Sequence, residues 1–106
     1  MVVRGEVWLV AYDPTVGSEI QKTRPAVVIS PPEMHDYLRT TIVAAMTSKG
    51  HPAVYRVPAL FQGVEGLVLL DQIRAVDKRR LLRRLGGLDP STLHRVLDTL
   101  GEMFAP

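Results

Sequence analysis

The sequence contains no cysteine among its 106 residues. The chain can therefore form neither a disulfide bond nor a thiolate metal site, which fits a reducing compartment. Its three histidines, His35, His51 and His94, lie far apart and share no metal-binding spacing such as His-Glu-x-x-His. We expect each of them to have a surface or capping role, and we expect no metal and no other cofactor.

Long apolar runs are also missing. The longest one is far shorter than the ~18 residues that span a bilayer, and residues 1–8 lack the apolar stretch of a signal peptide. The sequence also has no Gly-Lys-Ser/Thr phosphate loop and no Gly-x-Ser-x-Gly nucleophile elbow. We therefore expect a cytoplasmic protein without a membrane partner. The missing motifs also mean that the sequence gives no support for a phosphate-loop nucleotide-binding protein or a serine hydrolase.

The length predicts one domain over residues 1–106, because half of this chain would be too small to bury a core of its own. A chain this short buries only about two-thirds of the surface that its unfolded form exposes. Pairing with a second copy would supplement that small core. We therefore expect a homodimer.

The formal net charge is only +2, but the basic residues are not evenly spread. Residues 74–84 contain six arginines and lysines and a single acid, Asp77. This segment has a positive field that would attract an anionic partner such as a nucleic acid. The alternative is a helix or an edge strand that displays solvated arginines, and the charges alone leave both open.

Short segments rich in β-branched and aliphatic residues, bounded by proline, glycine and aspartate, predict a series of strands. We expect them at residues 6–12, 26–30, 40–46 and 53–57, and at 67–70 with a continuation at 72–76 past a bend at Asp71. One helical turn is expected within residues 33–38. The glycine-rich segment 63–66 is expected to turn the chain into the 67–70 strand.

The last segment predicts an amphipathic helix. Asp89 suits the N-cap and Pro90 suits the first helical position. The apolar stripe of this helix consists of Leu93, Val96, Leu97, Leu100 and Phe104. Several short strands followed by one such helix predict a mostly β protein with some α structure, in which a small curled antiparallel barrel carries the helix across it.

The motifs come in a characteristic order. They are GEVW at residues 5–8, DP at 13–14, GSE at 17–19, TRPAVVIS at 23–30, IVAAMTS at 42–48 and DQIRAVD at 71–77. Together they closely resemble the signature of the MazF/PemK toxins over roughly residues 4 to 80. The resemblance implies an SH3-like antiparallel β-barrel of the PemK/CcdB kind with a C-terminal helix.

The resemblance also implies a function. Such a chain would be the toxin of a type II toxin-antitoxin system, a metal-independent and ribosome-independent endoribonuclease that cleaves single-stranded mRNA at short specific sequences. Its implied partners are single-stranded RNA, a second copy of the chain, and a cognate antitoxin with an acidic, disordered C-terminal segment.

The family pattern marks Arg24, Thr47 and Glu19 as catalytic candidates. A guanidinium donates two parallel hydrogen bonds to a phosphorane, a hydroxyl can hold a phosphate oxygen, and a carboxylate can act as general base. Without that pattern, the arginine would pair with an acid, the threonine would cap a turn and the glutamate would be solvated. The candidates for RNA binding are Lys22, Thr23, Ser48, Lys49 and Gln72.

Two departures from the family pattern matter. Leu69 occupies a position where some members carry an arginine that is proposed to assist protonation, so this chain must use another donor or none. The loop from Glu19 to Arg24 also lacks the glycine found there in many relatives, which bears on RNA sequence preference. Aromatic stacking on RNA has little support, because the single tryptophan, Trp8, is expected in the core.

Two other functions remain as alternatives. Gyrase-poisoning toxins resemble this fold and bind a topoisomerase through a C-terminal aromatic end, whereas this chain finishes Glu-Met-Phe-Ala-Pro without a tryptophan. A non-catalytic barrel that binds RNA through a groove is the second alternative, because fold alone does not determine function.

Overall fold

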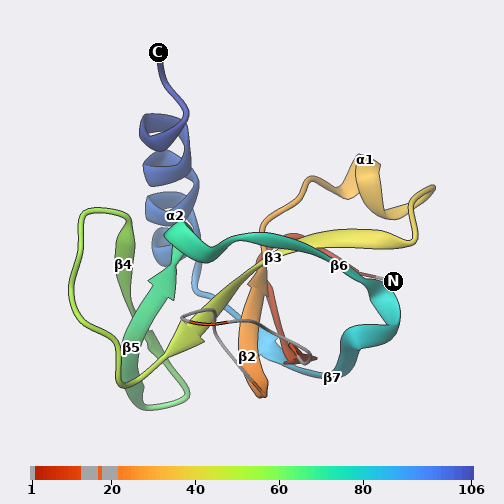
Figure 1. The fold of residues 1–106 in the computed structure, drawn as a ribbon, viewed down its shortest axis with the longest axis horizontal. Coiled ribbons are helices and arrows are strands. Elements are labelled where there is room, and N and C mark those ends of the chain that lie inside the picture. The colour runs from red at the N-terminus through yellow and green to blue at the C-terminus, as the bar shows by residue number, and fades with distance from the viewer. Residues whose placement is uncertain (1, 13–16, 18–21) are drawn as a thin grey trace.

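The computed structural model of the protein describes residues 2–12, 17 and 22–106, and shows a curled sheet with one long helix (Figure 1). The strands are β1 (Glu6–Ala11), β2 (Thr23–Val28), β3 (Thr40–Thr47), β4 (Arg56–Phe61), β5 (Val64–Leu69), β6 (Arg74–Asp77) and β7 (Leu81–Gly87). The helices are α1 (Pro32–His35), the 3-10 turns η1 (Leu70–Gln72) and η2 (Lys78–Arg80), and α2 (Pro90–Met103). Within these described residues, no helix is long and apolar enough to cross a membrane.

The strands form one antiparallel sheet in the order β4-β5-β3-β2-β1-β7, with β6 also paired to β3. The long strand β3 joins the two halves. Its first residues pair with β6, its middle pairs with β2, and its last two, Met46 and Thr47, pair with Val68 and Leu67 of β5. The expected mostly β fold with a C-terminal helix is therefore confirmed.

The sheet is not a closed barrel. Across the part of the chain that the structure describes, the two end strands β4 and β7 form no ladder with each other. They nevertheless approach, because the Gln62 Nε2 group donates a hydrogen bond of 2.8 Å to the Leu85 carbonyl oxygen. A Cβ atom placed on Gly86 would lie 3.4 Å from the Phe61 ring. The Gln62 side chain thus connects the end of β4 to β7, where a fully closed barrel would have backbone pairing between the two strands.

The hairpin of β4 and β5 lies later in the chain than the sequence predicts. The expected strand at residues 53–57 is wrong, because β4 runs from Arg56 to Phe61. Phe61 pairs with Val64 across the two residues Gln62 and Gly63, both with positive φ, as a tight hairpin turn requires. Proline at residue 58 is tolerated because β4 is an edge strand.

Two further differences lie after β5. The strand expected to run on from residues 67–70 to 72–76 is interrupted by η1, so that β6 pairs with β3 instead of extending β5. Strand β7 was not predicted as a separate element. It carries Arg83 and Arg84 beside β1 at the edge of the sheet, where the Arg84 Nε group pairs with the Glu6 Oε2 atom at 2.9 Å.

The interior consists of two apolar clusters, one on each face of the sheet. Alternate residues of β2 and β3 point to opposite faces, so Val27 and Ala44 belong to one cluster and Ala26 and Ala45 belong to the other. Both faces of these strands are buried, which explains why their sequences are continuous apolar runs and not alternating ones.

The helix α2 covers the first cluster beside β4, away from α1 (Figure 1). The predicted start is confirmed, because the Asp89 side chain accepts a hydrogen bond from the Thr92 N–H at 3.1 Å. Leu93, Val96 and Leu100 pack on the cluster as expected. Phe104 does not, because the helix ends at Met103 and leaves the Phe104 side chain 69% exposed.

His35 is buried, so its expected surface role is wrong. Its Nδ1 atom lies 2.8 Å from the Val2 carbonyl oxygen, which can only accept, and Nδ1 therefore carries the proton. The Nε2 atom lies 2.7 Å from the Ser30 hydroxyl oxygen and 3.2 Å from the Thr41 hydroxyl oxygen. This Ser–His pair is enclosed, and its contacts join the N-terminal segment to the sheet.

Leu70 should be essential to stability, because its side chain is fully buried in the cluster beneath α2. We expect Leu70→Ala to lower the free energy of unfolding by about 2–5 kcal/mol, since it leaves a cavity as well as losing apolar burial. Leu60→Ala is the control, because Leu60 is 62% exposed, and it should change that free energy by at most about 0.5 kcal/mol. Equal losses in urea unfolding of the two variants would contradict this assignment.

The N-cap of α2 should make stability depend on pH in acid. Hydrogen bonds from Ser91 and Thr92 lower the pKa of Asp89 to about 2, so its contribution is present above its usual pKa of about 4 and is lost as the pH falls towards about 2. Asp89→Asn keeps a capping oxygen and should melt closer to wild type at neutral pH than Asp89→Ala. Both variants should lose less stability than wild type between these two pH values. Thermal melts across this range would show it.

Candidate active site

The candidate site lies where the paired strands β2 and β3 reach the edge of the buried interior. Ala26 of β2 pairs with Ala45 of β3, and continuing this antiparallel register by two residues brings Arg24 opposite Thr47. The structure confirms their proximity, because both residues line one pocket together with Ser48. Two positions that are 23 residues apart in the sequence, Arg24 and Thr47, thus lie together because the strands are antiparallel.

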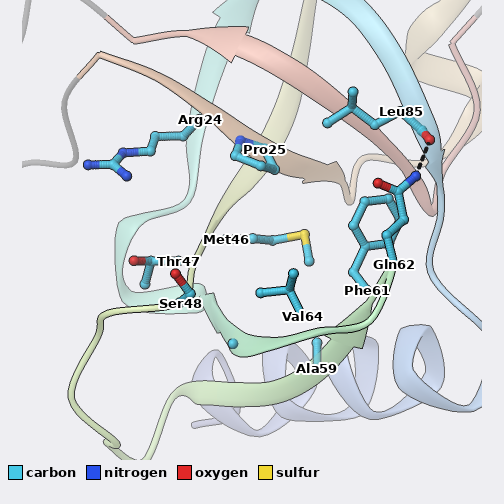
Figure 2. Close-up of a pocket in the computed structure, with 11 residues that line it drawn as sticks. Arg24, Pro25, Met46, Thr47, Ser48, Ala59, Phe61, Gln62, Val64 and Leu85 are labelled. Atoms are coloured by element: carbon cyan, nitrogen blue, oxygen red, sulfur yellow. Dashed lines mark hydrogen bonds between the residues drawn. The ribbon is translucent and has the colours of Figure 1, made fainter.

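The pocket is a cavity of about 260 Å³ with two different ends (Figure 2). Figure 2 shows Arg24, Thr47 and Ser48 at one end and Phe61, Gln62 and Leu85 at the other. Pro25, Met46 and Val64 lie between the two ends. The polar end offers a guanidinium and two hydroxyls to an anion, and the rest offers apolar surface to a flat or aliphatic group.

Thr47 is the last residue of β3, and its hydroxyl oxygen accepts a hydrogen bond of 3.2 Å from the Lys49 N–H. This contact is the turn-capping role that a threonine at a strand end commonly has. It uses the oxygen as an acceptor and leaves the hydroxyl proton available for donation. Thr47 can therefore cap the turn and still donate to a phosphate oxygen.

Two glycines allow the chain to pack closely around Thr47. A Cβ atom on Gly66 would come within 2.5 Å of the Thr47 carbonyl oxygen, and one on Gly50 would come within 2.9 Å of the Thr47 methyl carbon. Neither glycine has a positive φ, so close approach and not backbone conformation requires them. Their small size fixes where Thr47 lies.

The other predicted residues occupy different places. Thr23 pairs with Ala11 beside Arg24, and Lys22 precedes it with φ of 66° and a carbonyl oxygen that accepts from the Tyr12 N–H. Lys49 is exposed just after the pocket residues Thr47 and Ser48. The structure does not bring Gln72 into the pocket lining, since it lies in η1. Glu19 lies outside the described residues.

Comparison with known proteins gives the family. The family profile described as "PemK-like, MazF-like toxin of type II toxin-antitoxin system" matches residues 3–104. The chain belongs to this toxin family. It is 36% identical to the endoribonuclease PemK of Escherichia coli over 107 residues, covering 95% of this chain and 80% of that protein. It is 34% identical to the endoribonuclease EndoA of Bacillus subtilis over 106 residues, covering 94% and 91%.

Solved structures have the same fold. MazF from Deinococcus radiodurans superposes with a TM-score of 0.84 at 27% identity, covering 96% of this chain and 94% of that one. An endoribonuclease from a mycobacterial species, in complex with its cognate antitoxin, gives a TM-score of 0.83 at 18% identity and covers 100% and 98%. The second likeness concerns the fold alone.

Within this toxin-family fold, the structure adds a charged pair that the sequence did not reveal. Arg56 at the start of β4 and Asp71 in η1 form a two-point ion pair, with Nε to Oδ1 at 3.1 Å and Nη2 to Oδ2 at 2.9 Å. The hydrogen bonds from Arg56 hold the pKa of the Asp71 carboxyl below its usual range. Asp71 belongs to a recognised motif, but no spacing in the sequence indicates that its partner is Arg56.

Tyr12 is a second feature that sequence reasoning missed. It follows β1 directly and is fully buried, and burial raises the pKa of its phenol far above the usual value. The Arg74 guanidinium lies 5.6 Å from the centre of its ring, within cation–π distance. In the described part of the chain, no three His, Asp or Glu side chains come together as a metal-binding group.

Gly66 offers a structural test of how Thr47 is placed. We expect Gly66→Ala to lower the free energy of unfolding by about 1–3 kcal/mol, because the new methyl group would force the backbones of β3 and β5 apart. Amide exchange of residues near Leu67 should become faster, since Leu67 pairs with Thr47. Gly101→Ala is the matched control, because a Cβ there meets open space. Unchanged exchange in Gly66→Ala would contradict the close approach.

Proposed function

We propose that this chain is the toxin of a type II toxin-antitoxin system and an endoribonuclease that cleaves single-stranded mRNA at short specific sequences, without a metal and without the ribosome. The observation that carries the proposal is the meeting of Arg24 and Thr47 in one pocket of a chain whose curated relatives are named endoribonucleases. Cleavage of mRNA agrees with the expected cytoplasmic location.

The proposed reaction is attack of a ribose 2′-hydroxyl on the neighbouring phosphate. The O2′–P bond forms, the P–O5′ bond breaks, and the products are a 2′,3′-cyclic phosphate and a 5′-hydroxyl. Arg24 stabilises the charge on the phosphorane through two parallel hydrogen bonds, and Thr47 donates its free hydroxyl proton to a phosphate oxygen. Glu19 is proposed as the general base that takes the 2′-hydroxyl proton.

The leaving 5′-oxygen must gain a proton, which solvent water supplies here, because a guanidinium keeps its own protons and can only donate a hydrogen bond. In relatives that carry an arginine at the position of Leu69, that arginine is implied to help, but here Leu69 is buried in the second apolar cluster and offers no donor. Arg24 already lies at the polar end of the pocket. We therefore assign both charge stabilisation and assistance to the leaving group to Arg24.

The RNA strand is proposed to contact Lys22, Thr23, Ser48, Lys49 and Gln72. Ser48 and Lys49 follow Thr47 directly, and Lys22 and Thr23 precede Arg24, so four of these five residues are sequence neighbours of two of the three catalytic candidates. Lysines attract the phosphates, whereas the hydroxyl and amide groups suit sugars and base edges. The slope of log affinity against log salt concentration should become shallower by about 0.7 for each phosphate contact removed, the value for single strands.

Two protein partners are proposed. The first is a cognate antitoxin with an acidic, disordered C-terminal segment, which would be attracted to the basic RNA site and cover it. One solved structure with this fold is described as an endoribonuclease bound to its cognate antitoxin. A chain with the same fold also occurs in a MazE-MazF crystal structure from Deinococcus radiodurans. The second is another copy of the chain, because a small core gains burial from pairing.

Arg24→Ala should test the proposed function directly. We expect the single-turnover rate of RNA cleavage in EDTA to fall by about 10²–10³, the effect of removing one preorganised transition-state donor. Arg95→Ala is the control, since Arg95 is an exposed arginine on α2 outside the pocket, and it should cleave at the wild-type rate. A thermal melt of each variant checks folding.

Three outcomes would count against the proposal. They are a near-wild-type rate in Arg24→Ala, a strict need for added divalent metal, and cleavage of the matching DNA strand, which lacks the attacking hydroxyl. Wild-type protein that binds RNA or a topoisomerase without cutting RNA would favour the non-catalytic barrel or the gyrase-poisoning alternative.

A further inference from the structure

Arg56 makes an unusual set of contacts for a surface arginine. Its Nε and Nη2 groups bind both carboxylate oxygens of Asp71, and its Nη1 group donates to the His51 carbonyl oxygen at 3.1 Å. The planar guanidinium thus uses three of its nitrogens on two separate segments. One segment is η1, after β5, and the other is the connection between β3 and β4.

The connection at residues 48–55 begins directly after Thr47 and is mostly exposed. At its start, the Lys49 N–H donates to the Thr47 hydroxyl, and at its end the Arg56 N–H donates to the Ala53 carbonyl oxygen. Between these two points, the Nη1 group of Arg56 holds the chain at His51. The backbone and the side chain of Arg56 therefore both bind this loop.

Gly50 connects the Arg56 contacts to Thr47. A Cβ atom built on Gly50 would lie 2.9 Å from the Thr47 methyl carbon and 3.8 Å from the Arg56 Nη1 atom. Gly50 therefore lies close to both the Thr47 methyl group and the Arg56 guanidinium. A change in the guanidinium position would be transmitted to Thr47 through a single residue.

Stability alone is a weak explanation for this arrangement. The side chains of Arg56 and Asp71 are 21% and 40% exposed, so water screens their attraction and limits what the pair adds to folding. The geometry is nevertheless well defined, since η1 is anchored by the Leu70 N–H, which donates to the Tyr55 carbonyl oxygen at 3.0 Å. This backbone bond holds η1 beside the end of the connection, so that Asp71 lies within reach of the Arg56 guanidinium.

We propose that Arg56 is a positioning residue of the RNA-cleavage site, which ties the loop at residues 48–55 to Asp71 and so holds Thr47 and Ser48 in place beside Arg24. The proposal rests on the proposed ribonuclease function. Arg56 acts through Thr47 and Ser48 and is not assigned contact with the reacting atoms. Its removal should therefore slow the chemical step more than it weakens RNA binding.

Arg56→Ala should lower the single-turnover cleavage rate by about 10–100-fold, the effect of displacing a reacting group by a fraction of an ångström to one ångström. Its affinity for an uncleavable 2′-deoxy analogue of the same RNA should change by less than about threefold, and its melting temperature should stay near that of wild type. Amide exchange at Lys49 should become faster, because its hydrogen bond to Thr47 depends on the same loop.

Arg79→Ala is a closely matched control. Arg79 forms the same kind of two-point contact with Asp77, at 3.1 and 3.3 Å, but Asp77 lies at the opposite end of β3, paired with Thr40. At saturating RNA, this variant should keep the wild-type rate of the chemical step. Arg56→Lys adds a second comparison, because a lysine keeps the charge but not the planar fork, and it should recover only a small part of the lost rate.

A double-mutant cycle with Asp71→Asn tests the proposed route. If Asp71 supports Arg56, the double variant should be no slower than the more impaired of the two single variants. If the fold-losses in cleavage rate of the two single variants multiply in the double variant, Arg56 does not act through Asp71. Full recovery of the rate by Arg56→Lys, or an equal loss of rate in Arg79→Ala, would also overturn this proposal. A wild-type rate in Arg56→Ala would overturn the positioning role while Arg24→Ala still tests the function. Failure of wild-type protein to cleave RNA would overturn both proposals.

Discussion

Burial of β3 on both faces is the constraint on which the rest of the structure depends. This strand pairs with β2, β5 and β6, and its residues Val43 to Met46 contribute to both apolar clusters. A buried strand can carry no polar side chain without a partner, since an unsatisfied polar group costs more than it contributes. Polar chemistry is therefore confined to the ends of the strand, where the chain meets solvent.

Each end of β3 meets this constraint differently. At the first end, Thr41 is fully buried and its hydroxyl is satisfied inside the enclosed network with Ser30 and His35. At the other end, Thr47 is partly exposed and lines the pocket, and its hydroxyl oxygen accepts from the Lys49 N–H. Two threonines six positions apart on one strand thus have opposite roles. Accessibility, and not residue type, separates the structural hydroxyl from the candidate catalytic one.

How much the sequence could predict depends on how local each cause is. Asp89 and Pro90 start α2 by contacts within one turn, and the apolar runs of β2 and β3 indicate burial wherever the strands pair. Other features depend on which distant segments meet in space, and the residues next to them in the sequence do not indicate it. These features are the start of β4, the burial of His35 and the exposure of Phe104. For the site, the family pattern identified Arg24 and Thr47, but their approach through antiparallel register came only from the structure.

The position of Leu69 shows why a missing residue has to be judged in three dimensions. Along the sequence, this leucine replaces an arginine of some relatives, and the sequence offers no replacement nearby. In the sheet, Leu69 pairs directly with Arg56 on β4, so a guanidinium still lies beside this strand although it comes from a residue 13 positions earlier. Leu69 itself packs into the second cluster. Cross-strand neighbours are closer in space than most sequence neighbours, but this guanidinium is paired with Asp71, so the leaving group is still assigned to Arg24 and Arg56 has a positioning role.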